Sequence, residues 1–416
     1  MDALVERALA LVADPETGGV FLDGGPGGRG YLAVEPEQTV VGADPSGLAL
    51  VQAVFEGRRP GLCAGHVTYD AGAAWLLGRS PRPSLLPPVF VRHYAAWAEL
   101  AGDRVRRFGG DPAGVEMLRR RLSATPPASS GPVPIEAPRA VLPPAVHRAR
   151  VAQALAAIRR GDTYQVNLAQ PFFGPTAPPA AERSLGARAA DLYRRLRAGA
   201  PAPLGALYEV FGAHVVSNAP ETLLVLERCG GVVRASSRPI KGTRPRGATP
   251  AADRAAAREL LESAKDRAEH VMIVDLVRND LGRVARTGTV AAPRSPALVT
   301  LPTVHHLESE VTAEIDPGRS LAEVFLALFP GGSVTGAPKR RTVEIIDELE
   351  GRARGVYCGA IFVATAGRFV ASIPIRTGVL TACGLELLAG GGIVEDSDPE
   401  AERLESEVKT RAFRFS

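Results

Sequence analysis

The feature that most constrains the fold is residues 204–237, where strand-like segments follow one another along the chain. These segments are short, rich in apolar residues and separated by brief turns, as in a meander of strands. Strands joined by tight turns pair antiparallel, because a parallel pair needs a long crossover. Residues 354–363 and 369–376 are a second pair of strand candidates with a short connection. The sequence therefore predicts extensive antiparallel sheet.

The chain divides at a stretch rich in Pro and Ser. This stretch, residues 123–145, predicts a linker or a long loop between residues 1–122 and residues 146–416. The first part alternates short strands and helices with many glycines. Its clearest strand candidates are Val20–Leu22, Thr39–Val41 and Phe90–Tyr94.

Helices are predicted in the later part by apolar residues that recur every three or four positions. Val151, Leu155 and Ile158 form one such series, and Gly161 is a suitable end for that helix. One long helix is predicted over residues 251–283. The residues expected along its buried stripe are Leu261, Ala264, Ala268, Val271, Asp275 and Arg278.

The composition excludes several classes of protein. The net charge is +4, but basic residues are scattered and aromatic residues make up only 5%, so nucleic-acid binding is not expected. The four cysteines form no Cys-x-x-Cys pair, so neither a zinc site nor a disulfide framework is predicted. The absence of an apolar run of 18 residues and of an N-terminal signal predicts a cytoplasmic protein without a membrane partner.

One short motif points to a different chemistry. Gly61–His66 is similar to the Gly-x-Cys-x-Gly-His nucleophile turn of class I glutamine amidotransferases, but Val67 stands where that motif continues with Gln. No convincing His-x-Glu pair follows downstream. Cys63 is therefore interpreted as a structural thiol.

A candidate nucleophile lies in the segment Arg238–Arg244, which follows a strand-like run. Pro239 limits the local backbone, and Gly242 allows the backbone to approach a ligand closely. Lys241 follows an apolar residue at the strand end, where its side chain can point inward. Desolvation lowers the pKa of a lysine and makes it a nucleophile. The simpler interpretation is a solvated charge in a turn.

Other polar residues interrupt apolar segments. Gln165 and Asn167 alternate with apolar residues, which predicts either an edge strand or a strand that lines a cavity. Glu221 follows a proline at a turn, where it is either solvated or a proton donor and acceptor beside a cavity. The adjacent His305 and His306 point to opposite faces of a strand, so only one of them can face a cavity.

Charged residues and glycines complete the set. Glu269 flanks the long predicted helix, and Glu405 and Lys409 share one face of a final helix. Two carboxylates with water suit Mg²⁺. Arg376 at an apolar strand end suits a carboxylate, and Gly390–Gly392 leave backbone N–H groups open to an anion. The pattern indicates a site for a small carboxylated and hydroxylated metabolite.

Six longer segments share their pattern with one known family: Gly161–Leu168, Pro239–Thr243, Lys265–Gly282, Thr303–Leu307, Pro330–Lys339 and Gly390–Pro399. In these segments the chain resembles the chorismate-utilising enzymes, strongly over residues 145–412 and weakly in the N-terminal third. The resemblance implies an α+β fold, a four-layer α/β/β/α sandwich of two large antiparallel sheets with helices outside. Residues 1–122 would belong to that sandwich, residues 123–145 would be a surface loop, and residues 146–416 would be the chorismate-binding catalytic part.

Two positions distinguish the reactions of this family. Members that add water at C2 carry Lys where this chain has Gln165, and anthranilate-forming members typically carry Ala where it has Lys241. The chain is therefore more similar to aminodeoxychorismate synthase component I, with anthranilate synthase component I as the alternative. The resemblance implies that Lys241 attacks C2 of chorismate as the C4 hydroxyl leaves, and that ammonia then attacks C4 and expels the lysine. The product would be 4-amino-4-deoxychorismate, a precursor of 4-aminobenzoate and folate.

The resemblance also implies roles for individual residues. Glu269 and Glu405 would bind Mg²⁺, and Glu221 and His306 would act with Lys241 in catalysis. The residues expected to contact chorismate are Gln165, Gly242, Thr243, Tyr357, Arg376, Gly390, Gly391, Gly392 and Lys409.

Two departures from the family concern its partners and its regulation. No glutaminase is fused to the chain, so ammonia is expected from a separate glutamine amidotransferase subunit in a heterodimer. Phe21–Gly24 departs from the Leu-Leu-Glu-Ser pattern of the tryptophan-regulated members, which leaves tryptophan binding open.

Overall fold

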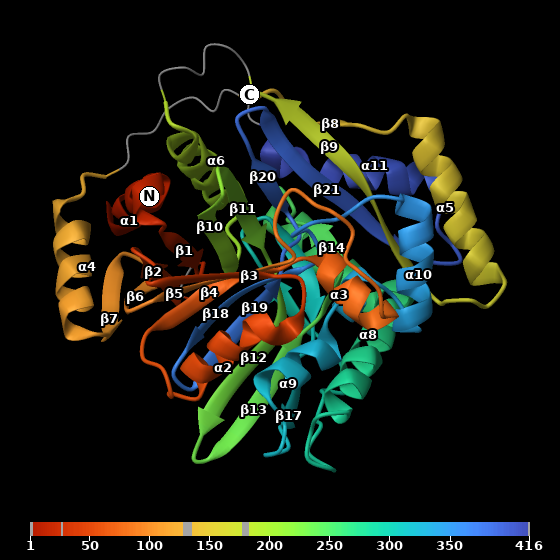
Figure 1. Cartoon of the computed structure of the whole chain (residues 1–416). Helices are drawn as coiled ribbons and strands as arrows, with labels where there is room; N and C mark the ends of the chain where they lie inside the picture. Colours follow the sequence, from red (N-terminus) through yellow and green to blue (C-terminus); the bar gives the residue numbers. More distant parts are fainter. Residues whose placement is uncertain (1–2, 26–27, 128–134, 177–182, 415–416) are drawn as a thin grey trace.

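The computed structural model describes residues 3–25, 28–127, 135–176 and 183–414 (Figure 1). These residues form two large sheets and one small sheet, and every strand pair in them is antiparallel. The prediction of extensive antiparallel sheet is confirmed. The meander of residues 204–237 forms four consecutive strands, shared between the two large sheets.

The strand order of the ten-stranded sheet is β7 (Arg104–Gly110), β6 (Ala96–Ala101), β2 (Gly30–Ala33), β1 (Val20–Asp23), β10 (Leu204–Val210), β11 (Ala213–Ala219), β20 (Thr377–Leu380), β21 (Gly384–Ile393), β9 (Val166–Pro175) and β8 (Arg139–Ala140). The order of the eight-stranded sheet is β17 (Val311–Glu314), β13 (Val232–Arg238), β12 (Glu221–Cys229), β19 (Arg368–Ile373), β18 (Ala360–Thr365), β4 (Leu62–Val67), β5 (Val89–Tyr94) and β3 (Gln38–Gly42). The small sheet consists of β14 (Ile240–Pro245), β16 (Val304–Glu308) and β15 (Ala297–Thr300).

The helices of the described residues are α1 (Ala3–Ala13), α2 (Leu48–Phe55), α3 (Tyr69–Leu77), α4 (Pro112–Ala124), α5 (Pro144–Arg159), α6 (Leu185–Gly199), α7 (Pro250–Glu262), α8 (Ala264–Gly282), α9 (Leu321–Leu328), α10 (Lys339–Glu350) and α11 (Pro399–Lys409). The strands predicted at Val20–Leu22, Thr39–Val41 and Phe90–Tyr94 correspond to β1, β3 and β5. None of these helices is long and apolar enough to cross a membrane.

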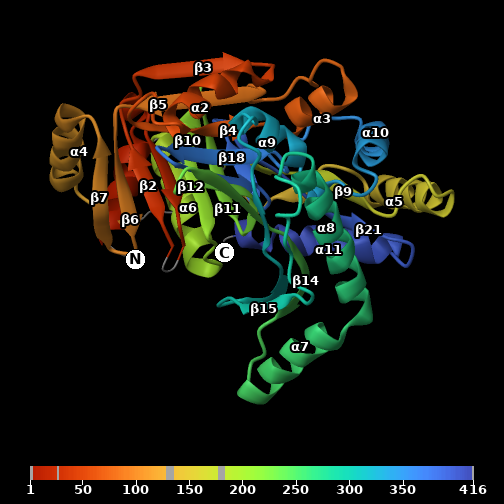
Figure 2. The ribbon, with the colours of Figure 1, turned by 90° about the horizontal axis from the view of Figure 1, so that it is seen from below.

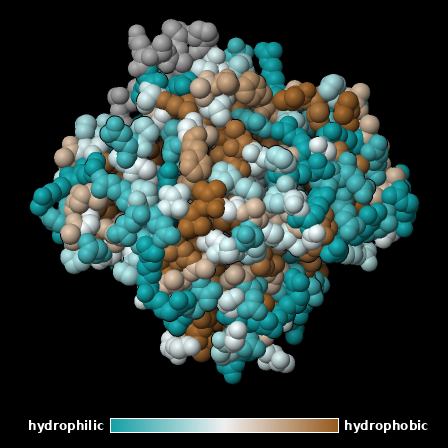
Figure 3. Space-filling model, in the orientation of Figure 1, coloured by the Kyte–Doolittle hydropathy of each residue, from teal (hydrophilic) through white to brown (hydrophobic). Residues whose placement is uncertain are grey.

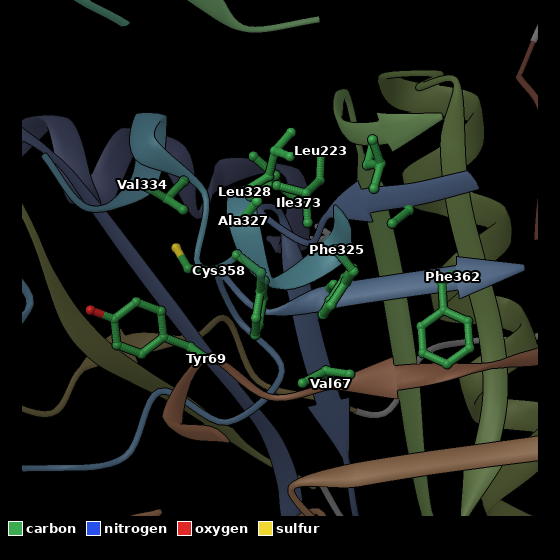
Figure 4. Packing of buried hydrophobic residues seen from close by; sticks show 14 of the residues in the cluster. Val67, Tyr69, Leu223, Phe325, Ala327, Leu328, Val334, Cys358, Phe362 and Ile373 are labelled. Atoms are coloured by element: carbon green, nitrogen blue, oxygen red, sulfur yellow. The ribbon is translucent and has the colours of Figure 1, made fainter. Parts of the chain in front are cut away.

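Three buried apolar clusters correspond to the layers of a sandwich. One lies between the two large sheets and includes Val20 of β1 and Phe90 of β5. A second joins α1, α4 and α6 to the outer face of the ten-stranded sheet. The third joins α2, α8 and α9 to the eight-stranded sheet, where Figure 4 shows Phe325 of α9 close to Ile373 of β19. Apolar burial is the main stabilising contribution to such a fold. Since the three clusters lie between the two sheets and between each sheet and its helices, the predicted sandwich arrangement is confirmed.

The residues before and after the Pro-rich stretch contribute strands to the same sheet, since β1 pairs with β10. Within residues 123–145, α4 ends at Ala124, β8 is formed by Arg139–Ala140, and residues 128–134 lie outside the described part. In Figure 3 hydrophilic residues dominate the left and right sides of the molecule, and hydrophobic residues gather near the middle of this face.

The prediction of one long helix over residues 251–283 is wrong. Ser263 has an extended backbone between α7 and α8, and its side-chain oxygen accepts a hydrogen bond from the N–H of Asp266. This break resets the helical phase, so the predicted stripe is wrong as well. Val271 is 53% exposed, whereas the buried residues of α8 are His270, Ile273, Val274, Val277, Asp280 and Leu281.

Candidate active site

Lys241 lies on β14 in the small sheet, which protrudes with α7 from the body of the molecule in Figure 2. The pairing of β14 with β16 is irregular between Lys241 and Thr243. Gly242 at this irregularity has a φ of +76°, and an added Cβ would lie 2.9 Å from the side chain of Leu260. Gly242 was predicted to let the backbone approach a ligand closely; the described structure shows that it lets the backbone approach Leu260 of α7 and Asp266 of α8.

The Lys241 ammonium faces the ten-stranded sheet. Its Nζ donates a hydrogen bond to Oε1 of Gln165 at 3.2 Å and lies 3.9 Å from a carboxylate oxygen of Glu269. An added Cβ on Gly392 would lie 3.1 Å from the same Nζ. Burial lowers the pKa of Lys241, Glu269 opposes this effect, and the Lys409 ammonium adds to it. The structure therefore does not support the interpretation of Lys241 as a solvated charge in a turn.

Strand β9 brings two amide side chains to this site. Asn167 pairs with Gly392 on β21, and Gln165 lies just before β9. Both residues are buried, and neither Gln165 Nε2 nor Asn167 Nδ2 has a hydrogen-bond partner among the described residues. A buried amide nitrogen without a partner is costly, so these donors suit an oxygen-rich ligand.

Glu221 begins β12 and is only 4% exposed. Burial raises its pKa from an ordinary value of 4.5 to about 7, although the Lys241 charge acts in the opposite direction. Its Oε1 has no hydrogen-bond partner in the described part of the chain, and the same is true of Ser333 Oγ. A carboxyl group with a pKa near neutrality can donate and recover a proton at physiological pH.

Two carboxylates of α11 approach Gly391 of β21. An added Cβ on Gly391 would lie 3.0 Å from Oε2 of Glu402 and 3.4 Å from Oε1 of Glu405. Lys409 pairs with Glu405 at 2.7 Å and donates to the carbonyl oxygen of Gly390 at 2.7 Å. Glu402 was not predicted as a site residue, although its spacing of three residues from Glu405 on one helix indicated it.

These carboxylates do not form a complete metal cage. Among the described residues, no group of three or more His, Cys, Asp or Glu side chains is close enough to hold a metal ion. Mg²⁺ does not need such a cage, because it retains waters and is commonly held by one or two carboxylates and an anionic substrate. Glu269, which also influences the pKa of Lys241, and Glu405 fit that requirement.

Arg376 and His306 form another part of the site. Arg376 lies between β19 and β20 with a φ of +52°, an uncommon conformation for a residue with a side chain. Its guanidinium makes no ion pair with any described carboxylate, and burial lowers its pKa. Burial also lowers the pKa of His306, and the Arg376 charge contributes. A half-buried cation without an ion pair suits the carboxylate of a ligand.

The two adjacent histidines face opposite ways, as predicted. His305 contacts Oδ1 of Asp253 at 2.9 Å and Oγ1 of Thr300 at 2.9 Å, which ties β16 to α7 and β15. His306 is paired in register with Thr243, whose side chain is exposed. Tyr357 is buried, with Cys358 and Arg354 among its electrostatic neighbours, and its described contacts do not include Lys241.

Two further residues near the site were not predicted from the sequence. His270, next to Glu269, has a pKa lowered to about 4 by burial and by Lys241, and its Nε2 contacts Oγ of Ser309 at 2.7 Å. Ser333 lies close to Glu221 and belongs to residues 330–339, the Gly-rich turn before α10. Cys63 is buried without a disulfide, and burial raises its pKa to about 12, which agrees with a structural thiol.

Comparisons with known proteins assign a family to this arrangement. Residues 39–414 match the family model described as chorismate binding enzyme. The chain is 36% identical to an anthranilate synthase component 1 of Haloarcula marismortui, over 96% of this chain and 88% of that protein. It is 43% identical to the aminodeoxychorismate synthase component 1 of Salmonella typhimurium, but over only 61% of this chain and 53% of that protein.

A solved structure gives the same result for the fold. The anthranilate synthase component I of Streptococcus pneumoniae superposes with a TM-score of 0.76 at 25% identity, over 92% of each chain. The predicted two-sheet sandwich is therefore confirmed in a solved structure. The family match also includes most of the N-terminal third, where the sequence resemblance is weak.

Proposed function

Because this chain belongs to the chorismate binding enzyme family, we propose that it aminates chorismate at C4 with ammonia, giving 4-amino-4-deoxychorismate. The observation that carries the proposal is the position of Lys241. Its side chain is only 15% exposed and its amine is held by Gln165, and partial burial lowers its pKa. A neutral lysine amine in such a place is a nucleophile, and a tethered nucleophile has a high effective concentration.

The proposed reaction consists of two displacements. In the first, the neutral Lys241 amine forms a bond to C2, the ring double bond shifts, and the C4 hydroxyl leaves as water with a proton from Glu221. In the second, ammonia forms a bond to C4, the double bond shifts back, and Lys241 leaves C2. The attacking ammonia returns one proton to Glu221, so the net change is replacement of OH by NH₂ with release of water.

The other residues bind and orient the substrate in this proposal. Arg376, Gln165 and the backbone of Gly390–Gly392 receive its carboxylates. Glu269 and Glu405 would hold Mg²⁺, which when bound would supply positive charge close to an anionic substrate. His306 lies close enough to Arg376 for the guanidinium to lower its pKa, so we assign it a neutral polar contact at the ring.

Ammonia is proposed to come from a separate glutamine amidotransferase. Two relatives of the chain carry names that describe them as component 1 of a synthase. Cys63 cannot serve as the glutaminase nucleophile, because it is buried within β4 and its pKa is raised. Free ammonium salt should therefore replace the partner in an assay.

Anthranilate synthase component I is the second candidate. It is favoured by the relative from Haloarcula marismortui, which matches the chain over nearly its full length. Identity alone does not separate the two activities, because the aminodeoxychorismate synthase relative is more identical over a shorter segment. Lys241 is the feature that favours amination at C4.

One incubation tests the proposal. Purified protein is mixed with chorismate, Mg²⁺ and an ammonium salt at mildly alkaline pH, and products are separated before and after addition of an aminodeoxychorismate lyase. We expect a product that retains the enolpyruvyl group and is converted to 4-aminobenzoate by the lyase. Fluorescent anthranilate with release of pyruvate, formed without the lyase, would contradict the proposal and support the alternative.

A further inference from the structure

The N-terminal half of β9 lies at an edge of the ten-stranded sheet. The neighbouring strand β8 pairs only with Phe172 and Phe173, at the other end of β9. An edge strand leaves backbone N–H and C=O groups without a partner strand. The unpaired part of β9 includes Asn167 and Ala169, which pair on their other side with Gly392 and Gly390 of β21. The position of this edge therefore affects the shape of the candidate site.

Two side chains replace the missing strand along this edge. The carbonyl oxygen of Asn167 accepts a hydrogen bond from Nη2 of Arg354 at 2.6 Å. The N–H of Ala169 donates to Oε1 of Glu350 at 2.8 Å. Just before these contacts along the strand, the N–H of Asn167 donates to the carbonyl oxygen of Thr335 at 2.8 Å. The backbone groups of the edge are thus satisfied by α10, the loop after it, and the Gly-rich turn.

Arg354 and Glu350 form a buried pair with good geometry. Their side chains are 1% and 2% exposed, and two hydrogen bonds of 2.8 Å and 2.6 Å join them. The remaining Arg354 donor, Nη1, contacts the carbonyl oxygen of Val334 at 3.1 Å, and the guanidinium lies 4.4 Å from the ring centre of Tyr69. Asp70 accepts the backbone N–H of Arg354 at 3.2 Å. The cost of removing two charges from water is offset only when the pair has good geometry and its remaining donors also form hydrogen bonds, as they do here.

The contacts of Arg354 span two walls of the candidate site. Asn167 is paired with Gly392, whose added Cβ would contact Lys241. Val334 follows Ser333, the residue beside Glu221. Figure 4 shows Tyr69, Cys358 and Val334 along one side of the buried cluster.

We propose that Arg354, oriented by Glu350, is a positioning residue for the active site. It holds β9 and the Gly-rich turn at a fixed separation, so that Gln165 and the backbone of Gly390–Gly392 meet the substrate carboxylates while Lys241 meets the ring. Arg354 itself touches neither the substrate nor Lys241. The inference depends on the proposed function only for the choice of chorismate as the ligand in the assay.

A double substitution separates positioning from stability. Replacing a buried ion pair by apolar residues of similar size is often neutral for stability, so Glu350→Leu with Arg354→Met should fold with a melting temperature within a few degrees of the wild type. We expect the KM for chorismate to rise at least tenfold and kcat to fall by a smaller factor. Amide hydrogen exchange at Asn167 and Ala169 should become faster in the same variant.

Arg352 provides a matched control in the same loop. Its guanidinium pairs with Glu386 at the surface, where the two side chains are 34% and 41% exposed. Arg352→Met should leave the KM, kcat and the exchange of β9 amides unchanged. Wild-type kinetic constants in the folded double variant would overturn the proposal and leave the pair with a structural role only.

Arg354→Lys decides the question if the double variant does not fold. Lysine keeps a positive charge beside Glu350, but it cannot bond the carbonyl oxygens of Asn167 and Val334 together with both carboxylate oxygens. The same rise in KM is expected, and an unchanged KM would again overturn the proposal. If the wild type shows no reaction with chorismate, the proposed function fails. If the exchange rates of the β9 amides are unchanged in the variants, the positioning role of Arg354 is refuted, whatever the substrate.

Discussion

The two sheets that meet at the candidate site differ in how firmly they are held. Strands β9 and β21 pair over ten positions inside the ten-stranded sheet, and most of their residues are buried. The small sheet that carries Lys241 and His306 has three short strands, and much of β14 and β15 is half-buried or exposed. In the proposed function, the larger sheet would provide a stable surface for the substrate carboxylates. The smaller one carries the proposed nucleophile Lys241, where limited movement is compatible with a covalent step, whereas the proposed acid Glu221 lies on the eight-stranded sheet.

The largest expected effect belongs to the small sheet. Lys241→Ala removes the proposed nucleophile and should reduce C4 amination by roughly 10³-fold or more, with little change in folding, because the lysine makes few contacts. The measurement is the rate of formation of the C4 amine. Lys265→Ala, at an exposed position of α8, is the matched control and should retain wild-type rates. If the Lys241→Ala protein aminates C4 at the normal rate, Lys241 is not the nucleophile, and the small sheet has no special chemical role.

A second effect concerns Glu221, whose pKa is raised to about 7 by burial. A raised carboxyl pKa means that the folded state binds the proton more tightly than the unfolded state. The free energy of unfolding should therefore fall as the pH rises from 4.5 to about 7, by up to about 3 kcal/mol, and then level off. Urea unfolding at several pH values measures this slope, and Glu221→Gln should flatten it.

The same titration should appear in the kinetics. Glu221 must be protonated and Lys241 neutral for the first displacement, so kcat/KM should rise and then fall with pH. Since the two groups interact, the apparent pKa values belong to the pair. A stability slope that is identical in the wild type and in Glu221→Gln would show that Glu221 is not the buried acid of the site.

A smaller effect is expected on the substrate-binding side. Arg376→Met removes a cation that makes no ion pair within the described part of the chain, so the fold should be preserved. Loss of a charged hydrogen-bonding partner costs about 2 to 3 kcal/mol, so the KM for chorismate should rise about 30- to 160-fold. Steady-state kinetics measure the change, with Arg278→Met on the surface of α8 as control. An unchanged KM would exclude a carboxylate contact by Arg376.

The smallest effect tests how the small sheet is joined to the rest of the molecule. The side-chain oxygen of Ser263 caps α8, directly after the helix that packs against the small sheet. Ser263→Ala should lower the free energy of unfolding by about 1 kcal/mol, the usual value of such a cap. Chemical denaturation measures the change. Leu261→Ala at an exposed neighbouring position should cost less, and equal effects would argue against the break between α7 and α8.

The sequence allowed the strands and several site residues to be predicted for local reasons. Alternating polar and apolar residues identified Gln165 and Asn167, and glycine identified the tight approach at Gly392. The break at Ser263 was not predicted, because apolar residues continue at helical spacing through a residue that caps the next helix. The role of Glu350 and Arg354 could not be predicted either, since their partners are backbone groups far away in the chain.

The most direct test of the central claim is an NMR experiment on the product formed from chorismate, Mg²⁺ and ¹⁵N-labelled ammonium. If Lys241 directs amination to C4, the label couples to the proton at C4, the enolpyruvyl group is retained, and Lys241→Ala forms none of this product. Label on the ring of anthranilate, or an unchanged yield of the C4 amine from Lys241→Ala, would contradict it.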